Sequence, residues 1–134
     1  MTNPILVTGA AGRIGAVGRT ITKLLLQQGK AVRAMVRKED ERAQALRDMG
    51  AEVVAGDLLD LDSMHRVIAG CETIYFGMSV SGSYLAATVN AAAVAKHHGV
   101  KAFINMSQVT LSQMSITKPP RGGSTSCSGS PNRR

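Results

Sequence analysis

Residues 5–15 read Ile-Leu-Val-Thr-Gly-Ala-Ala-Gly-Arg-Ile-Gly, and this stretch decides the fold. The apolar run at 5–7 predicts a short strand that ends just before the first glycine. Beyond the glycines, apolar residues recur at helical spacing as far as Gly29, namely Ile14, Val17, Ile21, Leu24 and Leu25. The stretch therefore predicts a strand, a glycine-rich turn and a helix in immediate succession.

The turn carries a glycine at every third position, Gly9, Gly12 and Gly15. Such a turn lets the main chain approach a pyrophosphate, whose charge meets the N–H groups and the positive dipole end of the following helix. We therefore assign dinucleotide binding to Gly9, Ala11, Gly12, Arg13, Ile14 and Gly15. The alternative is that the glycines only turn the chain. Gly18 repeats the spacing, so either the helix begins one turn later or Gly18 allows close packing of the helix on the sheet.

The rest of the chain repeats the alternation of strand and helix. Further strands are predicted at 31–36, 52–55, 73–76 and 102–106, and further helices at 39–49, 63–68 and 84–98. Asp62 or Ser63 is expected to cap the helix at 63–68. Strands that alternate with helices are typical of right-handed crossovers and a parallel sheet. We predict a three-layer α/β protein with a doubly wound parallel sheet, the Rossmann fold, in the strand order 3-2-1-4-5.

The net charge of +7 is unevenly distributed, because residues 118–134 hold four of the 16 basic residues and none of the nine acidic ones. This tail has no large apolar residue and cannot bury enough surface to offset the entropy of ordering. We predict a folded dinucleotide-binding domain at 1–117 and a disordered basic tail at 118–134. The tail lacks interleaved aromatic residues and any recognisable motif, which disfavours nucleic-acid binding.

Several other classes of protein are excluded by the sequence. No apolar run approaches the roughly 18 to 20 residues of a membrane helix, and the first residues do not resemble a signal peptide, so we expect a cytoplasmic protein. Cys71 and Cys127 lack the spacing of zinc ligands. His97 and His98 are expected to interact with a helix dipole rather than a metal, and His65 is expected on the surface. No metal site is predicted.

The end of the second strand distinguishes between cofactors. In dinucleotide folds an acidic residue at this point binds the ribose hydroxyls of NAD, whereas an arginine accommodates the 2′-phosphate of NADP. Here the strand ends in Arg37 and Lys38, and the first acidic residue is Glu39. We therefore predict that NADP(H) is favoured over NAD(H), and Arg13 could reach the same phosphate or the pyrophosphate. The charged run also suits the solvated start of a helix, and both interpretations can hold together.

A family resemblance is carried by five segments: ILVTGAAGRIG at 5–15, AMVRK at 34–38, GAEVVAGDLLD at 50–60, TIYFGMS at 73–79 and VKAFINMS at 100–107. They are similar to the NmrA-like branch of the atypical short-chain dehydrogenases, which are NAD(P)-binding Rossmann proteins. The resemblance covers residues 3 to about 117. It implies that Asp57 and Leu58 lie against the adenine. It also implies that Phe76, Gly77 and Met78 lie beside the ribose and diphosphate, and Ser107 near the nicotinamide.

The resemblance implies a parent activity of hydride transfer to a small organic acceptor, without naming the substrate. Classical members use a Tyr-x-x-x-Lys pair, in which the lysine lowers the pKa of the phenol. This chain lacks the pair, since Ser79 stands four residues after Tyr75 and Thr88 four residues after Tyr84. The NmrA-like branch includes reductases and also redox sensors that bind the dinucleotide without turnover and act on a protein partner. Enzyme and sensor both stay open, and no catalytic residue is assigned.

Members of the family are roughly twice as long, and the remainder supplies further strands and the substrate-binding portion. A shifted reading of the codons from Lys118 onward yields the start of an amphipathic helix similar to the family's continuation. Our hypothesis is that the tail is translated from a shifted frame and that the chain is a truncated product with little activity.

Overall fold

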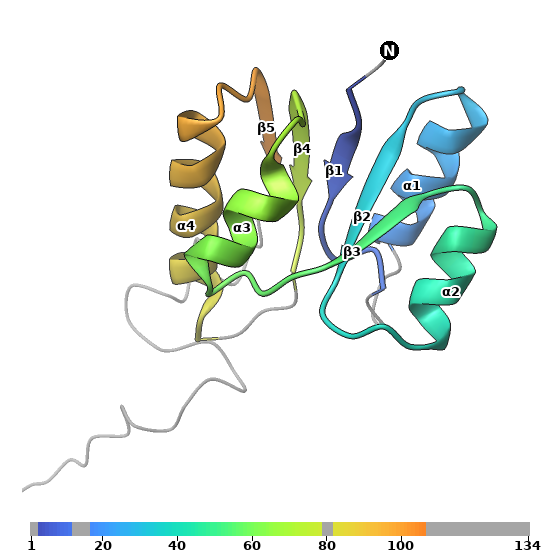
Figure 1. Ribbon diagram of the computed structural model, residues 1–134, viewed down its shortest axis with the longest axis horizontal. Helices are drawn as coiled ribbons and strands as arrows, with labels where there is room; N and C mark the ends of the chain where they lie inside the picture. The colour runs from blue at the N-terminus through green and yellow to red at the C-terminus, as the bar shows by residue number, and fades with distance from the viewer. Residues whose placement is uncertain (1–2, 12–16, 79–81, 107–134) are drawn as a thin grey trace, which may run out of the picture.

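The structure, a computed structural model, describes residues 3–11, 17–78 and 82–106 (Figure 1). These residues form a five-stranded parallel sheet in the order β3-β2-β1-β4-β5. The strands are β1 (Ile5–Val7), β2 (Val32–Val36), β3 (Glu52–Ala55), β4 (Thr73–Phe76) and β5 (Ala102–Asn105). The predicted α/β class and the predicted strand order are both confirmed.

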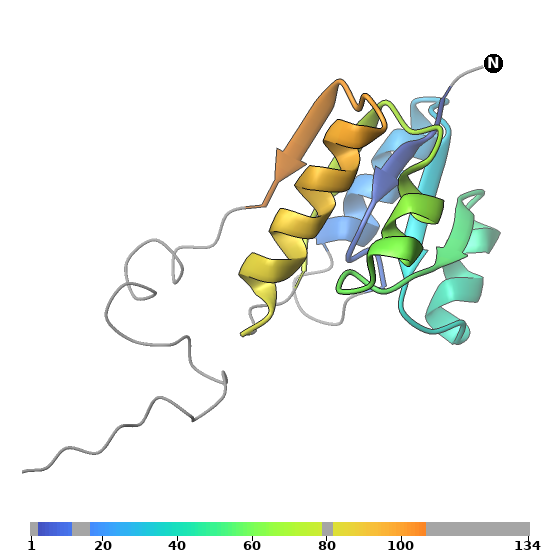
Figure 2. The same ribbon diagram turned by 60° about the vertical axis from the view of Figure 1, so that its left-hand side comes forward.

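Four helices cover the two faces of the sheet within the described ranges. They are α1 (Val17–Gln27), α2 (Glu41–Asp48), α3 (Leu61–Ile68) and α4 (Tyr84–His97). Helices α1 and α2 lie on one face, and α3 and α4 lie on the other (Figures 1 and 2). The chain winds outward from β1 in one direction and then from β4 in the other. The strand order therefore reverses between β1 and β4, and open α/β sheets bind their ligands at such a point.

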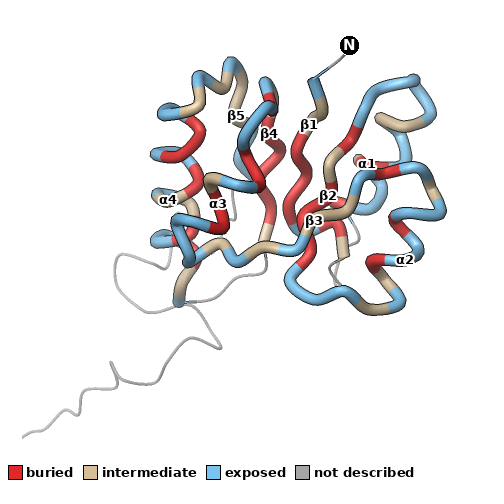
Figure 3. Tube along the Cα trace, in the orientation of Figure 1, coloured by how far each residue is buried: buried red, intermediate tan, exposed pale blue. Residues whose placement is uncertain are grey.

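The core follows from the alternation of side chains along each strand. Leu6, Ile74 and Phe76 pack toward α3 and α4, whereas Val7 and Tyr75 pack toward α1 and α2. All five are buried, and Figure 3 shows burial concentrated in the central strands. Strands that are apolar on both faces are typical of a parallel sheet with a layer of helices on each side.

The start of α3 differs from the prediction. The cap is Asp60, whose carboxylate accepts a hydrogen bond from the N–H of Asp62 at 3.1 Å. Ser63 is buried, and its hydroxyl accepts a hydrogen bond from the N–H of Asp57 at 2.8 Å. The assignment of the cap to Asp62 or Ser63 was wrong because Leu61, the first helical residue, is 49% exposed. An exposed leucine does not extend the buried face that marks a helix in the sequence.

Gly18 lies near the start of α1, where the helix meets the turn after β1. A Cβ atom at this position would lie 2.7 Å from the carbonyl oxygen of Gly9 and 2.9 Å from the nitrogen of Ala10. Both neighbours are main-chain atoms, which cannot move aside cheaply. Gly18 therefore allows α1 to pack closely on Gly9 and Ala10, which follow β1. The other interpretation, a helix that begins one turn later, concerns residues 12–16, which lie outside the described residues.

Three histidines meet where α3 packs against the end of α4. The Nδ1 atom of His65 lies 3.0 Å from the Nε2 atom of His98, and the ring centres of His65 and His97 are 5.1 Å apart. His65 is half-buried rather than on the open surface. Burial, followed by the nearby His65 and His97, lowers the pKa of His98. In the part of the chain that the structure describes, no group of three His, Cys, Asp or Glu side chains is placed to hold a metal ion.

Acidification is expected to destabilise the fold through this cluster. The pKa of His98 is lower in the folded chain than its usual value, so the unfolded chain takes up the proton first as the pH falls. Stability is therefore fully present at high pH and decreases as the pH falls through about 6.5. Urea unfolding should give a lower midpoint at about pH 5.5 than at about pH 7.5. The difference should shrink in His65→Gln, and an equal difference in both proteins would contradict the assignment.

Two further predictions from the sequence concern the domain boundary and membrane-spanning helices. The domain boundary near residue 117 and the tail at 118–134 lie outside the described residues and stay predictions. Within the described ranges, every helix is too short or too polar to cross a membrane.

Candidate dinucleotide-binding site

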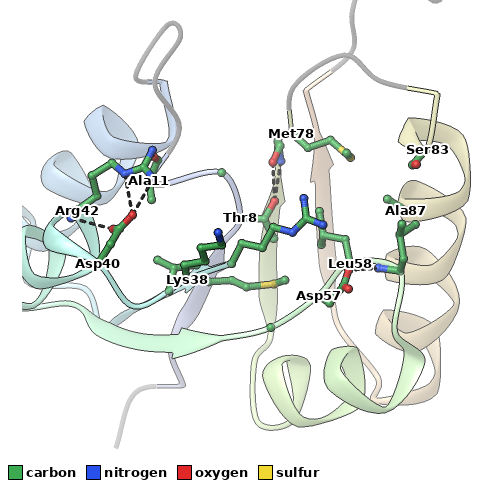
Figure 4. Close-up of a pocket in the computed structure, with 17 residues that line it drawn as sticks. Thr8, Ala11, Lys38, Asp40, Arg42, Asp57, Leu58, Met78, Ser83 and Ala87 are labelled. Atoms are coloured by element: carbon green, nitrogen blue, oxygen red, sulfur yellow. Dashed lines mark hydrogen bonds and ion pairs between the residues drawn. The ribbon is translucent and has the colours of Figure 1, made fainter. Parts of the chain in front are cut away.

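A cavity of about 810 Å³ lies at the carboxyl ends of β1, β2, β3 and β4 (Figure 4). Its walls come from the residues that follow these strands and from Ser83 and Ala87 at the start of α4. The volume is within the range of about 300–1,000 Å³ that is usual for small-molecule sites. The cavity thus occupies the place at which the sheet topology favours ligand binding.

Thr8 and Gly77, which both line this cavity, connect the ends of β1 and β4. The hydroxyl of Thr8 donates a hydrogen bond to the carbonyl of Gly77 at 2.8 Å and accepts one from the N–H of Gly77 at 2.9 Å. Thr8 is 1% exposed, so bulk water could not replace its hydroxyl as the hydrogen-bond partner of the N–H and the carbonyl of Gly77. The ends of β1 and β4 are therefore held in a fixed relation.

Gly9 begins the glycine turn and packs directly on Gly77, the residue that follows β4. Its φ is +74°, a conformation that side chains with a Cβ atom rarely adopt. A Cβ atom there would lie 2.6 Å from the carbonyl oxygen of Gly77. The first glycine of the motif is therefore required by the backbone conformation and by the close approach of the two strands.

Arg37 and Lys38 follow β2 and line the cavity. Both side chains are exposed and have no hydrogen-bond or ion-pair partner among the described residues. The acidic residues that follow them are already engaged. Glu39 forms an ion pair with Arg47 at 2.7 Å, and Asp40 forms one with Arg42 at 2.7 Å. This wall of the cavity therefore offers two available cations to an anionic ligand.

Asp40 and Arg42 link α2 to the glycine turn. One carboxylate oxygen of Asp40 caps α2 by accepting hydrogen bonds from the N–H groups of Arg42 and Ala43. The hydrogen bond from the Arg42 side chain holds the pKa of Asp40 below its usual value, and Asp40 raises the pKa of Arg42. Arg42 also donates to the carbonyl oxygen of Ala11 at 3.2 Å.

Asp57 and Leu58 form the wall after β3, where the resemblance predicts contact with adenine. The carboxylate of Asp57 accepts a hydrogen bond from the N–H of Leu59 at 2.9 Å, which closes a local turn. The carbonyl of Leu58 accepts a hydrogen bond from the side chain of Asn90 at 3.3 Å. Asn90 comes from α4, so this loop is attached to the opposite wall of the cavity.

The last residue of β4, Phe76, and the two residues that follow it occupy two environments. Gly77 and Met78 line the cavity, as expected for residues beside the ribose and diphosphate. The side chain of Phe76 is fully buried and stacks on Phe103 with ring centres 5.9 Å apart, so it packs in the core beneath the cavity. Nearby, the hydroxyl of Tyr84 donates to the carbonyl of Met106 at 2.7 Å, which attaches α4 to the end of β5.

Five of the predicted cofactor-binding residues lie outside the described residues. They are Gly12, Arg13, Ile14, Gly15 and Ser107. Their roles stay predictions. Among the other nine, the cavity is lined by Gly9, Ala11, Arg37, Lys38, Asp57, Leu58, Gly77 and Met78, while Phe76 is in the core. The structure thus brings together residues from four separate strand ends.

A comparison with known protein families assigns this chain to one of them. Residues 9–125 match the family model described as NAD(P)H-binding, over most of the chain. The chain belongs to this NAD(P)H-binding family. The resemblance found in the sequence is confirmed, because the similar solved structures include NAD(P)-dependent reductases. For a member of the NAD(P)H-binding family, a cavity at the reversal of strand order is the expected place for the cofactor.

Two solved structures and one curated protein illustrate the relation to the NAD(P)H-binding family. The triphenylmethane reductase of Citrobacter sp. is 29% identical, with a TM-score of 0.67 over 82% of this chain and 39% of that one. The NADPH-dependent quinone oxidoreductase of Escherichia coli, solved with NADPH, is 27% identical, with a TM-score of 0.69 over 81% of this chain and 38% of that one. A putative dihydroflavonol 4-reductase of Synechocystis sp. is 36% identical over 75 residues, which are 56% of this chain and 20% of that protein.

The chain spans only part of the proteins that it matches. The aligned segments cover between 12% and 22% of the length of the curated relatives. The similarity therefore concerns the cofactor-binding region of the NAD(P)H-binding family.

Three residues that shape the site were missed in the sequence. In the sequence, Thr8 only follows the strand predicted at 5–7, Asn90 falls within the helix predicted at 84–98, and Arg42 falls within the helix predicted at 39–49. Each one acts on a residue at least 31 positions away, namely Gly77, Leu58 and Ala11. The only signal for Thr8 was its place immediately before the first glycine, and no local pattern pointed to the other two.

Proposed function

We propose that this chain binds NADP(H) in preference to NAD(H) and forms the cofactor-binding part of a reductase of a small organic acceptor. One observation carries the preference. Arg37 and Lys38 line the cavity after β2 without partners among the described residues, whereas Glu39 and Asp40 are paired with other arginines. The cations are thus available to a 2′-phosphate, and the acids are not available to ribose hydroxyls.

The remaining walls suit the other parts of the dinucleotide. We assign the pyrophosphate to the glycine motif that begins at Gly9, because main-chain N–H groups and a helix dipole at such a motif favour a diphosphate. Asp57 and Leu58 form the wall assigned to the adenine, and Gly77 and Met78 the wall assigned to the ribose and diphosphate. The bound nicotinamide would supply the hydride, while the protein orients the cofactor and excludes water.

A titration with each cofactor tests the preference. The wild-type protein should bind NADPH more tightly than NADH, as measured by the fluorescence of the reduced nicotinamide. Arg37→Asp should raise the Kd for NADPH about 30-fold, because a phosphate loses a charge-assisted contact and meets a carboxylate. The Kd for NADH should change little.

Arg66→Asp is the matched control, since Arg66 is an exposed arginine on α3 that does not line the cavity. The same change of charge there should leave both affinities unaltered. Equal wild-type affinities for NADPH and NADH would remove the role of Arg37. Binding of neither cofactor would contradict the proposed function as a whole.

A redox sensor is the second candidate, and one observation favours it. Tyr75 and Tyr84 are buried, and neither is followed at the fourth position by the lysine that activates a catalytic tyrosine. Burial also raises the pKa of Tyr75, which opposes the loss of its proton. A sensor should bind NADP⁺ and NADPH with different affinities, consume neither and act on a protein partner. A reductase should oxidise NADPH in the presence of quinones, azo dyes or carbonyl compounds.

A further inference from the structure

Arg42 bridges two parts of the cavity wall that are far apart in the sequence. One terminal nitrogen, Nη1, donates to the carbonyl oxygen of Ala11 in the glycine turn at 3.2 Å. The other, Nη2, donates to a carboxylate oxygen of Asp40 at 2.7 Å, and Nε donates to the same oxygen at 3.2 Å. Figure 4 shows these contacts at the wall of the cavity where Ala11 lies beside Asp40 and Arg42.

The bridge is anchored at the α2 end by the cap of the helix. The second carboxylate oxygen of Asp40 accepts hydrogen bonds from the N–H of Arg42 at 3.0 Å and from the N–H of Ala43 at 3.4 Å. Asp40 therefore cannot turn away without leaving the start of α2 uncapped, which destabilises the helix. A guanidinium held by two nitrogens against this carboxylate has a fixed orientation.

The two arginines at this wall differ in what their charge is used for. Arg37 has no partner among the described residues, whereas the charge of Arg42 is compensated by Asp40. A compensated guanidinium attracts a phosphate less strongly than a free one. Its hydrogen bond to Ala11 has a different effect, because it holds the main chain at Ala11 and reduces the negative charge that this carbonyl presents to a pyrophosphate.

We propose that Arg42 is a positioning residue for the pyrophosphate of the dinucleotide, and that it does not itself bind the 2′-phosphate. It holds the main chain at Ala11, through the carbonyl, at a fixed place relative to the capped start of α2. Arg42 thus supports the part of the site that is common to NADPH and NADH, while Arg37 discriminates between them. The inference rests on the proposed function, since it assigns the pyrophosphate to this turn.

Three ligands separate these roles: NADPH, NADH and 2′-AMP, which has the adenine, the ribose and the 2′-phosphate without a pyrophosphate. In Arg42→Gln the Kd values for NADPH and NADH should rise by the same factor, about tenfold, which is the usual scale for losing one charge-assisted hydrogen bond. The Kd for 2′-AMP should stay within about twofold. In Arg37→Asp the affinities for NADPH and 2′-AMP should fall and that for NADH should not.

Two further variants keep the test independent of folding. Asp40→Asn retains an N-cap acceptor but removes the ion pair that orients Arg42. It should therefore weaken the binding of NADH, which has no 2′-phosphate for a released guanidinium to attract, even where Arg42→Gln is too unstable to study. Lys101→Gln is the matched control, because Lys101 forms an ion pair with Glu72 at 3.2 Å at the other end of the sheet. It should leave all three affinities unchanged.

These measurements distinguish a failure of the positioning role of Arg42 from a failure of the proposed function. A wild-type protein that binds none of the three ligands contradicts dinucleotide binding itself. Wild-type binding that is unaltered in both Arg42→Gln and Asp40→Asn overturns the positioning role alone. Selective loss of NADPH and 2′-AMP in Arg42→Gln, with NADH unchanged, also overturns it and makes Arg42 a direct ligand of the 2′-phosphate.

Discussion

Gly9→Ala is expected to lower the free energy of unfolding by about 3 kcal/mol or more and to abolish cofactor binding. Gly9 has a φ of +74°, which costs a residue with a Cβ atom about 1–2 kcal/mol. The added methyl group would also lie 2.6 Å from the carbonyl oxygen of Gly77. That oxygen belongs to the main chain immediately after β4, so relief of the clash would separate the ends of β1 and β4.

Gly29→Ala provides the control for the conformational part of this effect. Gly29 has a φ of +76° at the end of α1, but a Cβ atom there would meet nothing within 4 Å. Its replacement should therefore cost only about 1 kcal/mol and leave cofactor binding intact. Chemical denaturation and NADPH titration of both variants make the comparison. Equal destabilisation would show that the approach of Gly9 to Gly77 contributes nothing.

Thr8→Val is expected to lower the free energy of unfolding by about 2–4 kcal/mol. Valine has the shape of threonine without the hydroxyl, so it leaves the N–H and the carbonyl of Gly77 without their partner in the core. Each buried polar group that loses its hydrogen bond costs about 1–3 kcal/mol. NADPH binding should weaken as well, because Gly9 and Gly77 both line the cavity on either side of this contact.

Thr8→Ser separates the hydrogen bonds from packing. Serine keeps the hydroxyl that contacts Gly77 and removes only a methyl group, at a cost of about 1 kcal/mol. Urea unfolding should therefore rank the wild type first, the serine variant second and the valine variant last. A valine variant as stable as the serine variant would mean that the hydroxyl does not hold the two strands together.

The replacements of Gly9 and of Thr8 both act at the point where the order of strands in the sheet reverses. β1 pairs with β2 toward one edge of the sheet and with β4 toward the other edge. The crossover that follows β1 and the crossover that follows β4 therefore lead away from each other. The separation leaves a crevice at the carboxyl ends of the strands, which the cavity occupies. Gly9, Thr8 and Gly77 determine how closely the walls of that crevice approach.

Much of the fold could be predicted because its determinants are local. The apolar run at 5–7, the glycine at position 9 and the helical spacing after it act within a few residues of one another. The alternation of strands and helices indicated a parallel sheet, and the strand order followed from the doubly wound pattern to which such a sheet with a glycine turn after its first strand belongs. The start of α3 was misplaced because exposed Leu61 interrupts the apolar pattern, while the capping hydrogen bond of Asp60 is a feature of geometry.

The sequence by itself determined the fold class, the strand order and the presence of a glycine turn next to two basic residues. Only the tertiary structure decided which charges remain available, because the pairing of Glu39 with Arg47 depends on the turn of α2 and the bridge from Arg42 to Ala11 crosses 31 positions. It also decided that Thr8 contacts Gly77, 69 positions away. Periodicity and backbone preference are properties of short segments, whereas contacts between distant residues exist only once the sheet has brought the strand ends together.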